Sequence, residues 1–216
     1  MQRKIKFETW IQIMTLLLIV LNVVFSYAAF TSREVMGKAI FNPYLVSHNK
    51  EWWRFITSGF IHADWLHLGV NMFTLYFFGD ITLFMYKIAF GDHAIYYFLV
   101  MYFGGMIVAC LPAYQKHKDD PGYNALGASG AISSLLFAFI IFQPMEPIYL
   151  YGVIGLPGVI FAVLYLFYSN YAAKRARDNI GHEAHLWGAI FGFTFTLVMK
   201  PELFSKFIES ITGFLR

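Results

Sequence analysis

Long apolar segments separated by more polar stretches constrain the fold of this chain more than any other feature of its sequence. They lie at about 9–30, 65–86, 94–113, 127–142, 148–168 and 184–199. A helix of about 20 apolar residues crosses the hydrocarbon core of a bilayer. Of the 216 residues, 58% are hydrophobic and 13% are charged, and a globule of this size cannot bury so much apolar surface. The sequence therefore predicts an all-α membrane protein of six transmembrane helices, forming a single domain over residues 1–216.

The start of the chain indicates its orientation in the membrane. Arg3, Lys4 and Lys6 precede the first apolar segment, and residues 26–28 have the pattern of a signal-peptidase site. Because the apolar core is longer than the h-region of a signal peptide, we expect a retained helix. A basic start favours the cytoplasmic side, and an even number of spans returns the chain to that side. We expect a multi-pass protein of a plasma membrane or bacterial inner membrane, with both termini cytoplasmic.

Two further segments are predicted to lie at the membrane surface. The loop over 31–64 mixes aromatic residues with charged ones, a composition suited to the headgroup layer, so we expect it to dip into the membrane. The tail over 201–216 spaces its apolar residues as an amphipathic interfacial helix. Loop charges do not add to the orientation, because seven Lys and Arg residues fall on the predicted inner side and nine on the outer.

Composition excludes several classes of partner. The net charge is +3 without a basic block, so no nucleic acid is expected. Cys110 is the single cysteine and lies in an apolar run, so no internal disulfide is possible. No metal or cofactor site is predicted. The expected partners are the lipid bilayer and other membrane proteins, and no pattern in the sequence sets an oligomeric state.

The fifth apolar segment is expected to form a weak or kinked helix. Gly152, Gly155, Pro157 and Gly158 interrupt its pattern. A polar connection over 172–183 follows it. This part of the chain is therefore the least regular of the six predicted spans.

The parity of the spans brings three polar residues to one depth. With six spans, the second, fourth and sixth run in the same direction, and His67, Ser129 and His185 each lie within roughly the first turn of one of them. Polar side chains in lipid need partners, so we expect these three to meet near one membrane face. Asp80 comes more than three turns after His67, where a structural or interfacial carboxylate is expected.

The surroundings of Ser129 are suited to a nucleophile and an oxyanion. Gly127 and Gly130 flank its short motif and leave the hydroxyl and the backbone amide uncovered. His67 and Asn71 are four residues apart and share a helix face. Together with the Ser129 amide, their side chains are predicted to donate hydrogen bonds to the oxyanion of a tetrahedral intermediate.

His185 is the predicted general base. Gly188 and Gly192 follow it four residues apart, and such a stripe of small residues lets a neighbouring helix approach closely. Proton transfer from Ser129 requires that proximity, because a serine becomes a useful nucleophile when an adjacent imidazole takes its proton. The sequence therefore predicts acyl-transfer chemistry by a Ser129–His185 dyad, with His67 as an oxyanion donor.

Four motifs resemble those of the rhomboid family of intramembrane serine proteases. They are Trp53-Arg54, the H-x-x-x-N motif from His67 to Asn71, the G-x-S-G motif from Gly127 to Gly130, and the A-H-x-x-G-x-x-x-G motif from Ala184 through Gly188 to Gly192. Their order along the chain is also similar. The resemblance implies a six-helix bundle with a membrane-dipping first loop and an aqueous cavity open to the outside. It further implies cleavage of transmembrane segments of other proteins near the outer membrane surface.

Two positions depart from the family pattern. The family commonly has an aromatic residue four positions after the nucleophile, against which the catalytic imidazole packs, and this chain has Ser133 there. The family often has an acidic residue four positions after the glycine that corresponds to Gly79, and this chain has Leu83. We therefore expect His185 to be less firmly oriented, and we expect Ser133→Tyr to raise activity.

Substrate entry requires a moving part, because a transmembrane helix must unwind before its backbone can be attacked. The fifth segment and the connection over 172–183 are the expected moving parts. We also expect small residues at the cleavage site of a substrate and helix-weakening residues beyond it.

Two other functions are compatible with the composition. The first is a catalytically inactive rhomboid-like protein that binds client membrane helices, and the complete dyad argues against it. The second is a small channel or transporter with intramembrane histidines, which leaves the glycine-flanked Ser129 without an explanation.

Overall fold

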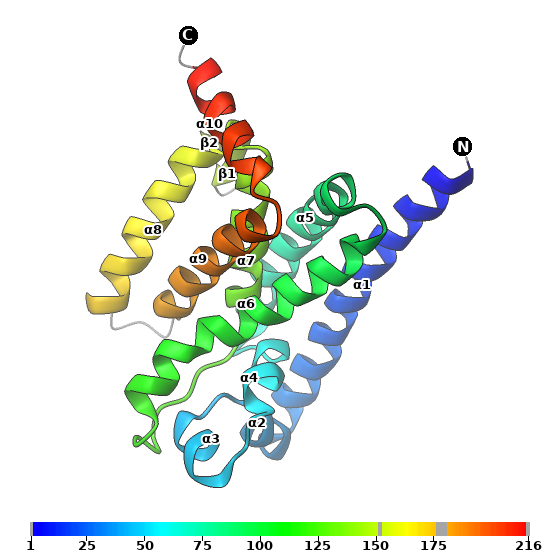
Figure 1. Ribbon diagram of the computed structural model, residues 1–216. Helices are drawn as coiled ribbons and strands as arrows, with labels where there is room; N and C mark the ends of the chain where they lie inside the picture. The colour runs from blue at the N-terminus through cyan, green and yellow to red at the C-terminus, as the bar shows by residue number, and fades with distance from the viewer. Residues whose placement is uncertain (1, 151–152, 176–180, 215–216) are drawn as a thin grey trace.

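The computed structural model describes residues 2–150, 153–175 and 181–214, and long helices dominate it (Figure 1). These are α1 (Gln2–Thr31), α5 (Trp65–Phe90), α6 (Ala94–His117), α7 (Ser129–Phe142), α8 (Gly158–Arg175) and α9 (His182–Met199). The shorter elements are α2 (Arg33–Ala39), α3 (Pro43–Asn49), α4 (Arg54–Thr57), η1 (Ser58–Phe60), η2 (Gly91–His93), α10 (Glu202–Phe214) and the strands β1 (Pro147–Leu150) and β2 (Ile154–Pro157). Over the residues that the structure describes, the all-α prediction is confirmed apart from this pair of strands.

Helix α7 occupies the centre of the bundle. Every residue from Gly130 to Ile141 is buried, and the helix packs against α5, α6 and α9. A helix that is apolar on nearly all sides is stable only when it is covered on all sides. The outer helices complete the arrangement, since α1 packs on α5 at one edge and α8 packs on α9 at the other (Figure 1).

Glycines set the close approach of α9 to α7. A Cβ added to Gly188 would lie 2.9 Å from the carbonyl carbon of Gly130, and one added to Gly192 would lie 2.5 Å from the Cα of Ser134. The two backbones are therefore in direct contact at both positions, as a small-residue stripe allows. The Ser134 hydroxyl lies 3.0 Å from the Gly130 carbonyl oxygen and 2.8 Å from that of Gly188, so it hydrogen-bonds to both helices.

Arg54 fixes the first loop from the inside. Its guanidinium donates to the carbonyl oxygens of Gly37 at 2.8 Å and Ile40 at 2.6 Å, and it pairs with the Glu51 carboxylate at 2.5 Å. Only 4% of Arg54 is exposed, whereas 54% of Trp53 is exposed. The Trp53-Arg54 motif thus combines a buried cation that ties α2 to α4 with an aromatic side chain on the surface. That this loop dips into a membrane stays a prediction.

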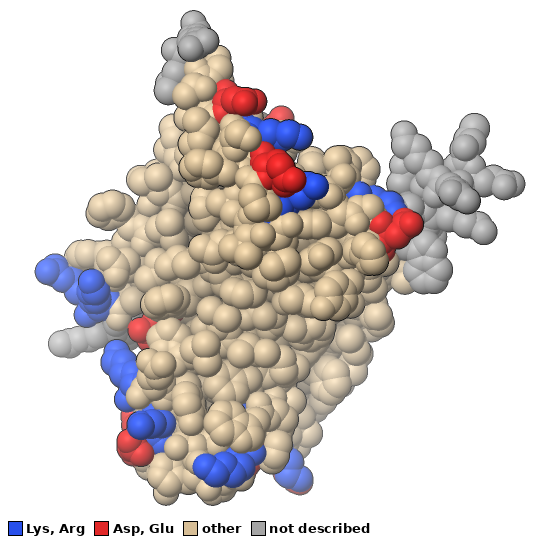
Figure 2. Space-filling model, viewed as in Figure 1, with Lys and Arg blue, Asp and Glu red and all other residues tan. Residues whose placement is uncertain are grey.

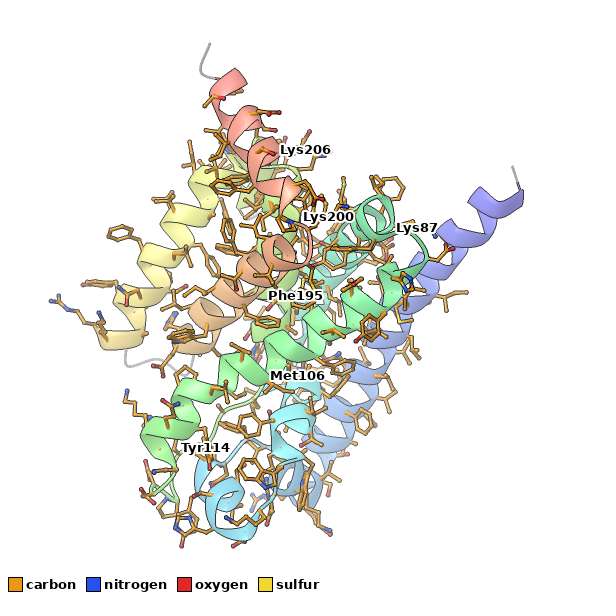
Figure 3. The ribbon with its side chains drawn as sticks, viewed as in Figure 1. Lys87, Met106, Tyr114, Phe195, Lys200 and Lys206 are labelled. Carbon is orange, nitrogen blue, oxygen red and sulfur yellow. The ribbon has the colours of Figure 1, made fainter. Side chains whose placement is uncertain are left out.

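The surface carries its charges toward the ends of the helices. Figure 2 shows Lys, Arg, Asp and Glu near those ends and a broad band of other residues between them. Figure 3 places Lys87, Lys200 and Lys206 toward one end of the bundle and Tyr114 toward the other. Among the described residues, the stretches 13–31 and 65–117 are long and apolar enough to cross a membrane. The stretch 65–117 contains both α5 and α6. A total of six transmembrane spans stays a prediction.

The prediction of a fifth helix over 148–168 was wrong for the first half of that range. Residues Pro147–Leu150 and Ile154–Pro157 form an antiparallel hairpin in which Pro147 pairs with Pro157, and α8 begins only at Gly158. Proline disfavours the helical conformation of the residue before it, and β-branched residues such as Ile148 and Ile154 suit a strand. Helix α8 instead continues to Arg175, into the predicted polar connection. Residues 176–180 of that connection lie outside the described residues.

Candidate active site

Ser129 is the first residue of α7 and is partly exposed, at the end of a polar loop. The preceding Gly127 has φ +116, a conformation that favours glycine, and its N–H donates to the Ser58 carbonyl oxygen at 2.9 Å. The chain therefore turns sharply into α7 and leaves the Ser129 hydroxyl at the N-terminal end of the helix, where the helix dipole is positive.

His67 lies against this turn. A Cβ on Gly127 would come within 2.7 Å of the His67 Cε1 and 2.9 Å of its Nε2, so the imidazole covers the backbone just before Ser129. Asp64 caps α5 by accepting the His67 N–H at 2.7 Å. The Asn71 amide nitrogen donates to the His67 carbonyl oxygen at 2.9 Å. That amide carries two N–H groups, so one N–H is not used in this bond.

His185 enters from the first turn of α9. The carbonyl oxygen of Ala184, the residue before it, lies 3.7 Å from where a Cβ on Gly130 would stand. The first turns of α7 and α9 are therefore adjacent, and they bring Ser129 and His185 to the same crossing. Among the described residues, no hydrogen bond joins the side chains of Ser129 and His185.

His62 belongs to the same region, although the sequence analysis did not identify it. Its Nδ1 lies 2.9 Å from the Ser26 hydroxyl oxygen, and that hydroxyl donates to the Phe60 carbonyl oxygen at 3.1 Å. Its Nε2 accepts the backbone N–H of Ala128 at 3.4 Å. The ring is therefore neutral with its proton on Nδ1, and it links α1 to the turn before Ser129.

Burial explains why this histidine is neutral. The side chain is fully buried, and burial, with the neighbouring His67 as a second cause, lowers the pKa of His62 to about 3. The rings of His62 and His67 meet edge to face with centroids 5.0 Å apart. His62 lies in the loop before α5, where no helical periodicity marks it, so only its position five residues before His67 could have singled it out.

Tyr165 of α8 is the second residue that sequence reasoning missed. Its ring stacks on His185 with a centroid distance of 6.3 Å and an interplanar angle of 26°. Its phenol oxygen lies 2.7 Å from the Ser133 hydroxyl oxygen. The premise that Ser133 leaves His185 without an aromatic neighbour is therefore wrong, because another helix supplies the ring.

His182 adds a second histidine one turn before His185. The two rings meet edge to face with centroids 6.1 Å apart, and Tyr168 contacts His182 in the same way at 5.5 Å. The first turn of α9 thus presents two imidazoles to two tyrosines of α8.

Comparison with known proteins gives the family of this chain. The family model described as the rhomboid domain matches residues 49–202. That range covers well over half of the chain and contains all four motifs. The chain belongs to the rhomboid family. The resemblance drawn from the motifs is thereby confirmed for this rhomboid protein.

Several curated relatives are similar to this rhomboid protein. The protein named "Putative rhomboid protease YdcA" of Bacillus subtilis (strain 168) is 32% identical over 160 residues, which cover 71% of each chain. RHOMBOID-like protein 12, mitochondrial, of Arabidopsis thaliana is 29% identical over 151 residues. That match covers 62% of this chain and 42% of the plant protein, so the chain spans less than half of that relative's length. Rhomboid-like protein 11, chloroplastic, of the same plant is 40% identical over 45 residues, or 21% of this chain and 16% of its own.

Proposed function

We propose that this rhomboid protein is a serine endopeptidase that cleaves transmembrane segments of other membrane proteins near the outer membrane surface. The observation that carries the proposal is the convergence of α5 and α9 on the start of α7. The His67 ring lies against Gly127, and the first turn of α9 lies against Gly130. These contacts support a shared role for Ser129, His67 and His185 in one site.

The proposed reaction proceeds through an acyl-enzyme. The Ser129 oxygen attacks the scissile carbonyl carbon while His185 takes the hydroxyl proton. The resulting oxyanion accepts hydrogen bonds from the His67 and Asn71 side chains and from the Ser129 N–H. His185 then protonates the leaving amine nitrogen as the peptide bond breaks. A water molecule, deprotonated by His185, hydrolyses the ester and restores the Ser129 hydroxyl.

The membrane arrangement is part of the same proposal. We infer six spans made by α1, α5, α6, α7, α8 and α9, with both termini cytoplasmic and the α2–α4 loop on the outer side. Helices α5, α7 and α9 then run in one direction, which supports a site at the outer end of all three. The partly exposed Ser129 at the end of a polar loop supports access of water to the site.

The test uses the full chain in proteoliposomes with a fluorophosphonate probe and a single-pass membrane substrate. We expect the probe to label Ser129, the substrate to be cut within its membrane helix, and both reactions to vanish in Ser129→Ala. Peptide mass spectrometry identifies the labelled residue and the new chain ends. A chain that binds the substrate helix without labelling or cleavage would contradict the proposal and support a client-binding rhomboid-like protein. Ion or solute flux through the same vesicles would support a channel instead.

A further inference from the structure

Tyr165 joins the outer helix α8 to the proposed base on α9. Its ring stacks on that of His185, with the centroid distance and angle given above. Two neighbours restrain the Tyr165 ring, namely Phe137 of α7 and Phe161 of α8, each with a centroid distance of 5.5 Å. Aromatic contacts have preferred geometries, so a restrained ring in turn limits the rotation of the imidazole against it.

Ser133 and Tyr165 form a size-matched pair. Ser133 is buried, and its hydroxyl oxygen lies 2.7 Å from the phenol oxygen of Tyr165. A larger side chain at position 133 would occupy the volume that the end of the Tyr165 ring fills. The small residue on α7 therefore makes room for the large residue on α8, and the phenol satisfies the buried hydroxyl.

We propose that Tyr165 is the positioning residue of His185, so that the orientation of the base depends on the placement of α8; this inference rests on the proposed protease function. An imidazole that rotates freely about its Cβ–Cγ bond presents the correct nitrogen to Ser129 for only part of the time. Stacking on Tyr165 removes that freedom. The ring comes from α8 and not from α7, which carries the nucleophile.

This placement couples substrate entry to chemistry. Helix α8 packs mainly against α9 at the edge of the bundle (Figure 1), and Val163, Leu164 and Phe167 on it are exposed. A displacement of α8 that admits a substrate helix also withdraws Tyr165 from His185. The base is therefore oriented only when α8 is docked, so acyl transfer follows the return of α8 to its place.

The experiment compares two substitutions at Tyr165 in the full chain in proteoliposomes. Tyr165→Leu removes the ring, and Tyr165→Phe removes only the bond to Ser133. A misplacement of a catalytic group by about 1 Å costs on the order of 10²-fold in rate. We expect Tyr165→Leu to lower kcat and the rate of fluorophosphonate labelling by about 10- to 100-fold with KM unchanged, and Tyr165→Phe to keep most of the rate.

A matched control lies one turn further along the same helix. Tyr168→Leu removes a tyrosine ring that contacts His182, and we expect it to leave the labelling rate unchanged. Thermal unfolding is measured for each variant. A folded Tyr165→Leu protein that labels at the wild-type rate would overturn the role of Tyr165. The proposed protease function would still hold in that case, because Ser129 of the wild type is labelled. If the wild type itself does not label, both conclusions fail.

A swap variant covers the case in which Tyr165→Leu does not fold. Ser133→Tyr combined with Tyr165→Ser supplies the ring from α7. A misplaced base is expected to lower the labelling rate by about 10²-fold. A labelling rate of the double variant within about tenfold of the wild-type rate therefore supports the role of Tyr165. A folded double variant that does not label overturns it.

Discussion

A methyl group added at Gly192 tests whether the spacing of two helices sets the rate of the proposed reaction. In Gly192→Ala the new Cβ would lie 2.5 Å from the Cα of Ser134, and ordinary van der Waals contact begins at 3.4 Å. The Ser134 carbonyl oxygen would be closer still, so the helices must separate by at least about 0.9 Å at this point. The contact is with backbone atoms, so no side-chain rotation relieves it. Overpacking of this kind costs about 1–3 kcal/mol of stability.

The displacement reaches the dyad because a helix moves as a rigid body over short distances. Gly192 lies seven residues after His185, about two turns along α9, and the atoms nearest to its added Cβ all belong to Ser134. Since a misplacement of about 1 Å costs on the order of 10²-fold, we expect the labelling rate of Ser129 to fall by about 30- to 100-fold, or about 2–2.7 kcal/mol in activation free energy.

The assay measures the second-order rate of fluorophosphonate labelling in detergent and in proteoliposomes, alongside thermal unfolding. Gly213→Ala on α10 is the control, because an added methyl group there meets nothing within 4 Å, and its labelling should equal that of the wild type. A misplaced dyad is expected to lower the labelling rate by about 10²-fold. A folded Gly192→Ala protein with a labelling rate within about threefold of the wild-type rate would therefore refute the link between helix spacing and rate.

Three further predictions concern the proposed active-site residues, the buried His62 and the movement of α8. His185→Ala should abolish labelling and cleavage, whereas His67→Ala or Asn71→Ala should each cost roughly 10²–10³ in rate with measurable turnover; labelling by His185→Ala but not by His67→Ala would exchange the two roles. The pKa of His62 is lowered from 6.5 to about 3, so the unfolded chain binds more protons in that range and stability should fall as pH drops from about 6.5 toward 3. His62→Gln should flatten that pH dependence in thermal unfolding, and an unchanged slope would exclude His62 as its source. A covalent tether between α8 and α9 should block cleavage of a membrane substrate while labelling by the small probe persists, and equal cleavage with and without the tether would disprove movement of α8.

Much of the helical part of the fold was predictable because its signals are local. The Asp64 cap, the apolar run after Ser129 and the glycine stripe on α9 act over four to eight neighbouring residues, and the structure contains each of them. The hairpin before α8 was not predicted because periodicity alone does not distinguish a buried helix from a buried strand over a short apolar run. Pro147 and Pro157 were treated as interruptions of a helix, whereas they are paired at the open end of the hairpin.

The candidate site was predictable only where its residues lie on regular helices. Parity places His67, Ser129 and His185 at one end of three helices that run in the same direction, and no side-chain detail is needed for that inference. Tyr165 could not be found in this way, because its partners lie on other helices and depend on how α8 packs. The expectation that Ser133→Tyr raises activity ignored this packing. With the Tyr165 phenol 2.7 Å from the Ser133 hydroxyl oxygen, the single substitution should overpack the site and lower activity.

Under the proposed protease function, the length of α7 determines where in the bilayer a substrate helix is cut. The helix has 14 residues, or about 21 Å at 1.5 Å per residue, whereas the hydrocarbon core of a bilayer is about 30 Å thick. With the turn at 143–146 at the inner boundary, as in the proposed orientation, Ser129 lies about 9 Å beneath the outer boundary. A substrate helix cut at this depth keeps about six residues on its outer fragment within the hydrocarbon. So short a stub cannot span a bilayer, and under the proposed protease function we expect the outer fragment of a single-pass substrate to leave the membrane while the rest of the helix stays behind.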